Sequence, residues 1–547
     1  MKKGMMGLAL LAAGLAQGAA LDGGTVYAWR GEKVVVWFDA MNRTPAAALW
    51  RPSSACAFVR AGLAMPVKGD GDRLYADRVV WGGAALVQPG EAVRVVAEAA
   101  VPRTGDVPAA FTVSCGDEAR AYALDVCARP FPEGRDRRVF LDLWQHPWAV
   151  ARYYRVEPFS KQHEAKMRPL WEQLADAGQK VITATIMDRP WAHQCFDAYR
   201  SMVRHIRTAD GGWRFDYTVF DRYVAFARAC GLGPQIHCYT LCPFRLKRYY
   251  WEDEKGAACF GDFEVGSPEF VDYWRAFLED FAAHLKAKGL FETTYIALDE
   301  RSPAELKAAC DLVKRYGGMK IAMAGDRPPS QFDGIKIDNF SIALQFVTPT
   351  YLAEAGARRA RGRTTTVYVA GGNPCTGTAQ PPIDCTWLGA YPGAVDLDGF
   401  LRWAYCSWPA NPNSDTTYWP WFGRWAAGGT YLVYPDGPSL RFLALRNGLN
   451  LSEKIQRLRA EGRLDAALAA TLKEFDYKGP KDYPPPPVTE DLLRRTAARV
   501  HAYMRQHQAQ VHQPAAPHGR ARPRRRDAAV TGVSCSHPRA EMVCCAR

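Results

Sequence analysis

The sequence has no long hydrophobic run after its first residues. Beyond residue 20 it contains no apolar stretch of the roughly 20 residues needed to span a bilayer. The first residues, MKKGMMGLALLAAGLAQGAA (1–20), place two lysines before an apolar run and then small residues, which is the pattern of a secretory signal. No cysteine lies near the expected cleavage after Gly18 or Ala20, which argues against a lipid anchor. We therefore expect a secreted or periplasmic protein with no stable membrane insertion.

A strong excess of positive charge is also missing from the body of the chain. The formal net charge is +13, but Lys2 and Lys3 belong to the signal, and residues 506–547 contribute seven arginines against two acidic residues. Residues 21–505 therefore carry a net charge of only +6, so nucleic acid is not the favoured partner. Residues 506–547 are rich in Pro, His and Ala and have no apolar periodicity, which predicts a disordered basic tail.

The cysteines show no spacing typical of a metal site. Cys238 and Cys242 lie close together in HCYTLCPF, but no second Cys or His pair at zinc-site spacing follows. We predict no metal and no cofactor. Because an exported protein can form disulfides, a bridge between Cys375 and Cys385 is one possibility, although the sequence alone does not establish pairing.

The chain divides into two parts with different patterns. Residues 21–130 contain short runs rich in β-formers, separated by Gly, Pro and Asp, which predicts a β-sandwich domain; examples are KVVVWFDA, RLYADRVVW, AVRVVAEAAV and AAFTVSC. RPFPEGRDRR (129–138) has the composition of a linker. Residues 137–505 are predicted to form the second domain.

In the second domain, strand-like and helix-like segments alternate. Eight strands are predicted at 139–144, 180–188, 234–244, 293–300, 320–326, 340–346, 364–372 and 399–408. Helices are predicted at 160–178, 220–231, 267–289 and 302–317, whereas the connection RPPSQFDGIKIDN (327–339) has no clear helix. This order favours an α/β fold, a (β/α)8 TIM-like barrel preceded by the β-sandwich, with a doubly wound sheet as the alternative.

Two adjacent carboxylates end the fourth predicted strand, in TTYIALDERSP (293–303). Active sites of such barrels form at the carboxyl ends of the strands, where Asp299 and Glu300 fall. Side chains alternate along a strand, so both can serve one site only if the strand breaks at Asp299. A structural alternative is that the acids belong to a helix start, since Ser302 and the Pro and Glu that follow look like an N-cap.

Aromatic and polar residues follow other predicted strands. They are Asp188, Trp191, His193 and Tyr199 after strand two, His237 and Tyr239 on strand three, and Trp403, Tyr405 and Trp408 at the end of strand eight. Each alone is more often a core residue than a ligand. Together they have the composition of a sugar site, because a pyranose face packs on an aromatic ring while acids and amides hold its hydroxyls.

Three segments of the chain resemble a known family. They are ALDE (297–300), the region DRPW...DAYRSMV...GGWRFDYTVFDRYV, and the long block GFLRWAYCSWPANPNSDTTYW...GGTYLVYPDGPSLRFLALRNGL. With these segments, residues 139–460 resemble glycoside hydrolase family 123, the β-N-acetylgalactosaminidases, and the related domain of unknown function 4091. The likeness is looser in the N-terminal part. Cys406 departs from the polar residue expected at its position.

The resemblance implies cleavage of terminal β-linked N-acetylgalactosamine from a glycan or glycoconjugate, with retention and with help from the substrate's own 2-acetamido group. Asp299 would then orient and stabilise the acetamido N–H, and Glu300 would act as general acid and base. The substrate would be bound by residues among Asp188, Trp191, His193, His237, Tyr239, Tyr368, Trp403, Tyr405 and Trp408. Tyr239, Tyr295 and Tyr368 are the candidates for donating a hydrogen bond to the acetamido carbonyl.

Two other functions stay open at this point. One is a non-catalytic carbohydrate-binding protein, and the other is a glycosidase of the same fold that acts on another sugar, because a barrel does not by itself specify an activity. The sequence leaves undecided the preference between GalNAc and GlcNAc, the aglycone and the oligomeric state.

Overall fold

Two β-sheets pack on each other in the N-terminal part of the computed structural model, which describes residues 24–192, 194–244, 247–332, 334–420, 423 and 425–511. One sheet is antiparallel, in the order β2 (Lys33–Met41), β7 (Ala92–Ala100), β4 (Val59–Lys68) and β5 (Leu74–Trp81). The other has the order β1 (Thr25–Arg30), β9 (Glu118–Pro130) and β8 (Ala110–Cys115), with β1 parallel to β9. A short antiparallel pair joins β3 (Ala48–Trp50) to β6 (Ala85–Val87).

One hydrophobic core fills the space between these two sheets. Phe38 and Val95 come from the first sheet, and Phe111 and Tyr122 from the second, where their rings stack with centroids 5.2 Å apart. Exposed and buried side chains alternate along β8, as expected for a strand with one face on a core. The predicted β-sandwich is confirmed.

The second domain is a nearly closed parallel barrel. Its strands follow chain order around the sheet, which excludes the doubly wound alternative. They are β10 (Phe140–Leu143), β11 (Val181–Thr185), β14 (Gln235–Tyr239), β17 (Thr294–Leu298), β18 (Lys320–Gly325), β19 (Asn339–Ala343), β20 (Thr364–Tyr368) and β21 (Gly399–Arg402). All eight coincide with predicted strands, and the predicted barrel is confirmed.

Side chains complete the barrel where the strand ladder is missing, between β10 and β11. The amide of Gln179 accepts a hydrogen bond from the backbone N–H of Leu143 at 2.9 Å, and Gln145 accepts one from Thr183 at the same distance. The Lys180 N–H donates directly to the carbonyl oxygen of Leu141 at 2.8 Å. Two buried glutamines therefore replace ladder bonds that the strands do not make, which satisfies backbone groups that burial would otherwise leave unpaired.

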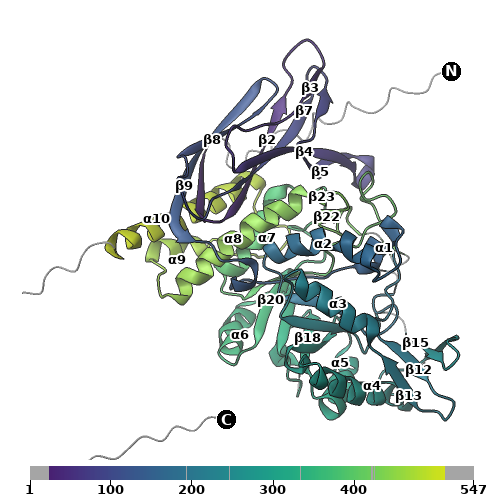
Figure 1. Cartoon of the computed structure of the whole chain (residues 1–547). Coiled ribbons are helices and arrows are strands. Elements are labelled where there is room, and N and C mark those ends of the chain that lie inside the picture. The colour runs from purple at the N-terminus through teal and green to yellow at the C-terminus, as the bar shows by residue number, and fades with distance from the viewer. Residues whose placement is uncertain are drawn as a thin grey trace, which may run out of the picture. The chain divides into compact units, whose positions relative to one another are not determined.

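Helices cover the outside of the barrel, and Figure 1 shows α3 to α6 around β18 and β20. The four predicted helices are confirmed, and the connection between β18 and β19 has only a 3₁₀ turn at Pro329–Gln331 among its described residues. The helices are α1 (Pro147–Tyr154), α2 (Lys161–Asp176), α3 (Thr218–Ala229), α4 (Pro268–Ala287), α5 (Pro303–Leu312), α6 (Pro349–Arg359), α7 (Pro382–Ala394), α8 (Leu440–Ala460), α9 (Ala466–Leu472) and α10 (Pro486–Val511).

A four-stranded sheet that the sequence analysis did not predict is added to the barrel. Its order is β13 (Trp213–Asp216), β12 (Arg204–Arg207), β15 (Arg248–Asp253) and β16 (Ala258–Asp262). β12 and β13 follow β11, whereas β15 and β16 follow β14. Figure 1 shows this added sheet beside α4. Its short strands carry many charged and aromatic residues, so neither periodicity nor length separates them from a loop in the sequence.

Ion pairs connect the β-sandwich to α8. Asp77 on β5 pairs with Arg441 at 2.9 Å, and Glu98 on β7 pairs with Arg446; all four side chains are buried. Arg441 also donates to the carbonyl oxygens of Gly428 and other loop residues. Removing one partner of such a buried pair leaves an uncompensated charge, so these contacts couple the two domains.

Some predicted segments lie partly or wholly outside the described residues. Residues 1–20, the expected signal, lie outside it, as do residues 512–547 of the expected tail. The helix α10 continues to Val511, five residues beyond the predicted start of that tail at 506. Cys375 and Cys385 are free thiols, so the possible bridge between them is not formed. No helix of the described residues is long and apolar enough to cross a membrane.

Candidate active site

The strand that carries the two acids stops directly before them. β17 ends at Leu298 with every residue buried, and the chain then turns through Asp299 and Glu300 before α5 begins. Ser302 caps α5, and Glu305 completes a capping box because its carboxylate accepts a hydrogen bond from the Ser302 backbone N–H. The predicted N-cap is thus confirmed, and it is made by Ser302 and Glu305 without Asp299 or Glu300. The two acids are left outside both the strand ladder and the helix cap.

Asp299 is nearly buried, with 13% of its side chain exposed. Burial raises the pKa of its carboxyl, whereas the Arg301 guanidinium, a backbone N–H and the indole N–H of Trp191 act in the opposite direction and lower it. Nη2 of Arg301 lies 2.7 Å from Oδ1 of Asp299. Among the described residues none donates a well-aligned hydrogen bond to that oxygen. Oδ1 therefore lies beside a positive charge and has acceptor capacity left for a ligand N–H.

Glu300 is more open to solvent than its neighbour. Its Oε1 accepts a hydrogen bond from the hydroxyl of Tyr368, which is the last residue of β20. Burial of the carboxyl raises the Glu300 pKa, and the charges of Asp299 and Asp326 raise it further, against a lowering by Arg301. Glu300 thus keeps its proton to higher pH than an ordinary glutamate, as a general acid must.

The two carboxyls titrate as a pair because their charges repel each other. Arg301 sits against Asp299 and lowers its pKa, while burial raises it. A negative charge on Asp299 raises the pKa of Glu300. An ionised Asp299 therefore favours the protonated form of Glu300.

Arg301 is a site residue that the sequence analysis missed. Its Nε and Nη2 donate to the carbonyl oxygen of Cys242 at 3.1 and 3.0 Å, and its guanidinium lies 5.0 Å from the ring centre of Phe244. Only 6% of its side chain is exposed. Its position directly after the acid pair was the available signal. However, adjacency in sequence does not show which way a side chain turns.

Aromatic residues form a wall beside Asp299. The rings of Trp144 and Trp191 stack with centroids 5.2 Å apart, and Tyr239 lies 4.4 Å from Trp144 and 5.1 Å from Trp191. Tyr199 meets Trp191 edge-on at 4.9 Å. Trp144 follows β10, and Tyr239 ends β14, so four strands contribute to one cluster with the acids. Of this wall, the sequence analysis predicted all but Trp144.

A second aromatic pair follows β21. Trp403 is half-buried, and its ring lies 5.1 Å from that of Trp425, whose indole N–H donates to the carbonyl oxygen of Gln194. Trp403 also lies 6.4 Å from the ring of His146, a residue that in turn contacts Trp191. This chain of ring contacts connects Trp403 to the aromatic wall.

Other predicted site residues have structural partners. Asp188 accepts hydrogen bonds from the side chain of Arg200 at 2.9 Å and from the backbone N–H of Ser201 at 2.6 Å, which folds the loop after β11. His237 lies inside the barrel, 3.6 Å from Asp142 and hydrogen-bonded to Gln235. His193 lies outside the described residues.

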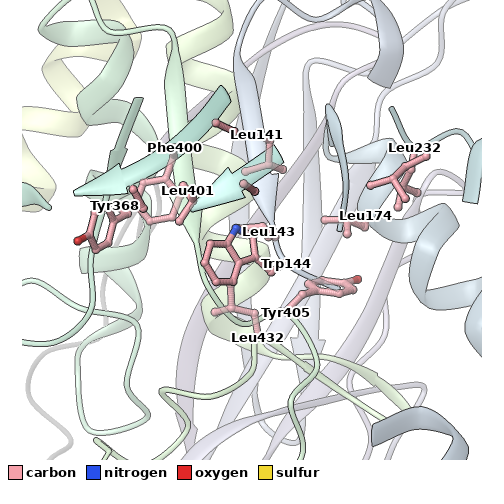
Figure 2. Packing of buried hydrophobic residues seen from close by; sticks show 14 of the residues in the cluster. Leu141, Leu143, Trp144, Leu174, Leu232, Tyr368, Phe400, Leu401, Tyr405 and Leu432 are labelled. Atoms are coloured by element: carbon pink, nitrogen blue, oxygen red, sulfur yellow. The ribbon is translucent and has the colours of Figure 1, made fainter. Parts of the chain in front are cut away.

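The side chains of Tyr405 and Trp408 lie in the hydrophobic core. The Tyr405 hydroxyl donates to the carbonyl oxygen of Leu170 at 2.9 Å, and the Trp408 indole donates to that of Val433 at 2.7 Å. Figure 2 shows Tyr405 among buried hydrophobic side chains that include Trp144 and Leu432. Both side chains are fully buried, and their polar atoms already have partners.

Tyr295 is separated from the acid pair along its strand. It is the second residue of β17, its ring lies 5.2 Å from that of His237, and Asp338 and Glu292 are the charges that act on its hydroxyl. Tyr239 and Tyr368, by contrast, end their strands on the same side as the acids. Cys406, the noted departure from the family pattern, is buried and accepts a hydrogen bond from the His146 backbone N–H at 3.4 Å.

The described residues hold no group of three or more His, Cys, Asp or Glu side chains that could bind a metal ion. The site consists of a carboxylate pair, one buried arginine, a tyrosine on the more exposed acid and a wall of indole and phenol rings. Two acids beside aromatic surfaces suit acid-base chemistry on a sugar.

Comparison with known proteins gives a family match and a solved structure of the same fold. The model of the glycoside hydrolase 123 catalytic domain matches residues 144–458. A solved family 123 glycoside hydrolase from Clostridium perfringens superposes with a TM-score of 0.80 at 21% identity, covering 90% of this chain and 95% of that one. An exo β-N-acetylglucosaminidase of family 20 from Vibrio harveyi aligns with a TM-score of only 0.22 at 8% identity, over 62% of this chain and 80% of that one. Among proteins with curated descriptions, none matches significantly. With more than half of its length matched by the family model, the chain belongs to glycoside hydrolase family 123.

Proposed function

We propose that this glycoside hydrolase is exported and removes terminal β-linked N-acetylgalactosamine from a glycan or glycoconjugate, with the substrate's 2-acetamido group as the nucleophile. The observation that carries the proposal is the unequal environment of two adjacent acids. Asp299 is nearly buried and paired with Arg301, whereas Glu300 is more exposed and has a raised pKa. Such a pair is suited to two different tasks at one sugar ring.

In the first step, the acetamido carbonyl oxygen attacks the anomeric carbon, and the bond from that carbon to the leaving oxygen breaks. Glu300 donates its proton to the leaving oxygen. The acetamido N–H hydrogen-bonds to Asp299, whose negative charge stabilises the positive charge that develops on the five-membered oxazoline ring. Burial raises the pKa of Asp299, and Arg301 lowers it, which favours the ionised form needed for this task.

In the second step, water attacks the anomeric carbon from the face that the aglycone left. Glu300, now a carboxylate, removes a proton from the water, and the ring C–O bond of the oxazoline breaks to restore the acetamido group. Two inversions at one carbon give a product with retained β configuration. The protein itself forms no bond to the sugar.

Tyr239 is the tyrosine that we assign to the acetamido carbonyl. Tyr239 ends β14 at the same end of the barrel as the acids. Burial raises its pKa well above the usual value, and the charges of Asp142 and Asp299 add to that effect, so its hydroxyl keeps its proton. Tyr368 already donates to Glu300. The buried rings of Trp144 and Trp191 pack against Tyr239 and hold its ring in place.

The proposal is tested with three aryl β-glycosides: the N-acetylgalactosaminide, the N-acetylglucosaminide and the plain galactoside. We expect the galactoside to be cleaved orders of magnitude more slowly, because it lacks the nucleophile. We expect the galactosaminide to be preferred over the glucosaminide. A fluorosugar trapped covalently on Asp299 or Glu300, or comparable turnover of the galactoside, would contradict the mechanism. Binding of GalNAc without any turnover would instead indicate a carbohydrate-binding protein.

Substitution of the buried acid provides a second test. Asp299→Asn keeps the shape of the side chain but removes the charge that stabilises the oxazolinium, and we expect kcat to fall by about 10²- to 10³-fold, similar to the loss of one transition-state electrostatic contact. A thiazoline that mimics the intermediate should bind the wild type much more tightly than GalNAc does. The variant should lose most of that difference in affinity.

A further inference from the structure

A depression of about 410 Å³ lies between the added sheet and α4, apart from the acid pair. Its surface is largely aromatic, with Trp213 from β13, Trp251 from β15, and Phe263 and Tyr273. Three charged side chains complete it: Arg207, Glu269 and Asp272. This volume is in the range of small-molecule binding sites.

The aromatic rings line the sides and the base of the depression. Trp213 and Trp251 lie nearly perpendicular, at 83° with centroids 6.0 Å apart, and Phe263 lies almost parallel to Trp251 at 14° and 6.1 Å. Tyr273 is buried below them, and its hydroxyl donates to the carbonyl oxygen of Tyr250 at 2.8 Å. Trp213, Trp251 and Phe263 are only partly buried. Ring surface is therefore left for a ligand.

Charged groups at the rim have hydrogen-bonding capacity to spare. Arg207 Nη1 donates to Asp272 Oδ2 at 2.9 Å, and its guanidinium lies 4.5 Å from the ring centre of Trp213. Trp213 Nε1 donates to the same Oδ2 at 3.4 Å. A guanidinium has five donors and a carboxylate about four acceptor positions, so these contacts use only part of either group. With 35% of Arg207 and 47% of Asp272 exposed, both can reach a ligand.

We infer that this depression is a second carbohydrate-binding site, distinct from the catalytic centre. An aromatic ring takes the apolar face of a pyranose, while a paired arginine and aspartate offer donors and acceptors to neighbouring hydroxyls. A purely apolar partner would leave these charges desolvated and unpaired, which is costly. The combination of partly exposed rings and a charged rim therefore favours a sugar over a hydrophobic peptide.

The depression lies on a sheet that is inserted at the catalytic end of the barrel, and this position indicates how it can serve the enzyme. β12 and β13 follow the carboxyl end of β11, and β15 and β16 follow that of β14, so the added sheet is inserted at the end of the barrel where Asp299 and Glu300 lie. A glycan chain held by this sheet raises the local concentration of its other branches at the catalytic centre. The inference goes beyond the proposed function, since binding here involves neither catalytic acid.

The inference is tested by measuring the affinity of the full-length protein for soluble mucin by native affinity electrophoresis. All variants carry Glu300→Gln, so that turnover does not consume the ligand and the catalytic site is identical throughout. We expect Trp251→Ala and Trp213→Ala each to weaken mucin binding about tenfold through loss of a stacking surface. The matched control is Phe260→Ala on β16 of the same sheet. This side chain is 58% exposed and outside the depression, and its loss should change affinity by no more than about twofold.

Melting temperatures separate lost binding from lost folding. If a tryptophan variant melts well below its parent, the test relies instead on Asp272→Ala, which replaces an exposed side chain. We expect Asp272→Ala also to weaken mucin binding severalfold. Unchanged affinity in folded Trp251→Ala, Trp213→Ala and Asp272→Ala proteins would overturn the inference. A loss of affinity confined to Phe260→Ala would overturn it as well, by placing binding on the opposite face. Failure of the enzyme to cleave N-acetylgalactosaminides would leave this measurement unaffected.

Discussion

Arg301 places its guanidinium 2.7 Å from the carboxylate of Asp299 while it donates two hydrogen bonds to the carbonyl oxygen of Cys242. The backbone contact holds the arginine in place, so the positive charge beside Asp299 is preorganised. Electrostatic help that needs no rearrangement during the reaction is the most effective kind. The two residues therefore act together with Glu300, and their loss should be visible in the pH dependence of the enzyme.

Arg301→Met should move the bell-shaped pH profile of kcat/KM to higher pH. Arg301 lowers the pKa of both Asp299 and Glu300, and its removal raises both. Because the reaction needs Asp299 ionised, activity is then lost at a higher pH as the solution is acidified, and we expect the acid limb to move by about one pH unit or more. The exposed pair Arg327 and Asp326 provides the control, since Arg327→Met should leave the acid limb in place. An acid limb that does not move in Arg301→Met would contradict the assignment.

Glu300→Gln should affect substrates according to their leaving groups. General-acid help matters most when the departing oxygen is basic, so hydrolysis of natural glycans should be abolished. Activated aryl glycosides, whose leaving groups need little protonation, should retain much more activity. Steady-state kinetics on a series of aryl β-N-acetylgalactosaminides with graded leaving-group pKa measures this difference. Equal losses across the series would remove Glu300 from the acid role.

Asp142→Asn should become more stable relative to the wild type as the pH rises. Burial inside the barrel raises the Asp142 pKa to about 8, above its value of about 4 in an unfolded chain. At low pH, Asp142 is protonated in both the folded and the unfolded state, so its pKa shift does not lower the free energy of unfolding. As the pH rises from about 4 to 8, the free energy of unfolding of the wild type falls, because the folded state holds a proton that the unfolded state releases. The neutral Asn has no such dependence. Thermal melts of both proteins from pH 4 to 8 test this, and a constant difference in melting temperature would show that Asp142 is ionised in the folded protein.

Asp77→Ala should destabilise the protein by about 3–5 kcal/mol, because it leaves Arg441 buried without its counter-charge. The control is Asp436→Ala, which removes the partner of the more exposed Arg78 and should cost no more than about 1 kcal/mol. Denaturant unfolding monitored by tryptophan fluorescence compares the two. Similar costs for both substitutions would mean that the buried pair does not couple the sandwich to α8.

The position of a residue along a strand predicts which end of the barrel it occupies. Asp299, Trp191 and Tyr239 all follow or end barrel strands, and parallel strands bring such residues together at one end. The same reasoning selected Tyr405 and Trp408, which also follow a strand. Their chain segment turns back into the core, and their polar atoms bond to Leu170 and Val433. Only the path of the backbone after the strand separates these two outcomes.

The sequence by itself determined the two-domain architecture, the eight barrel strands and the location of the acid pair, because buried strands and amphipathic helices follow from the local spacing of apolar residues. The tertiary structure alone decided which side chains surround that pair. The ion pair between Asp299 and Arg301, the bond from Tyr368 to Glu300, and the added sheet with its aromatic depression are contacts whose geometry local sequence does not encode. Charge, burial and pKa depend on neighbours brought together from distant segments, so they arise only when the chain is folded.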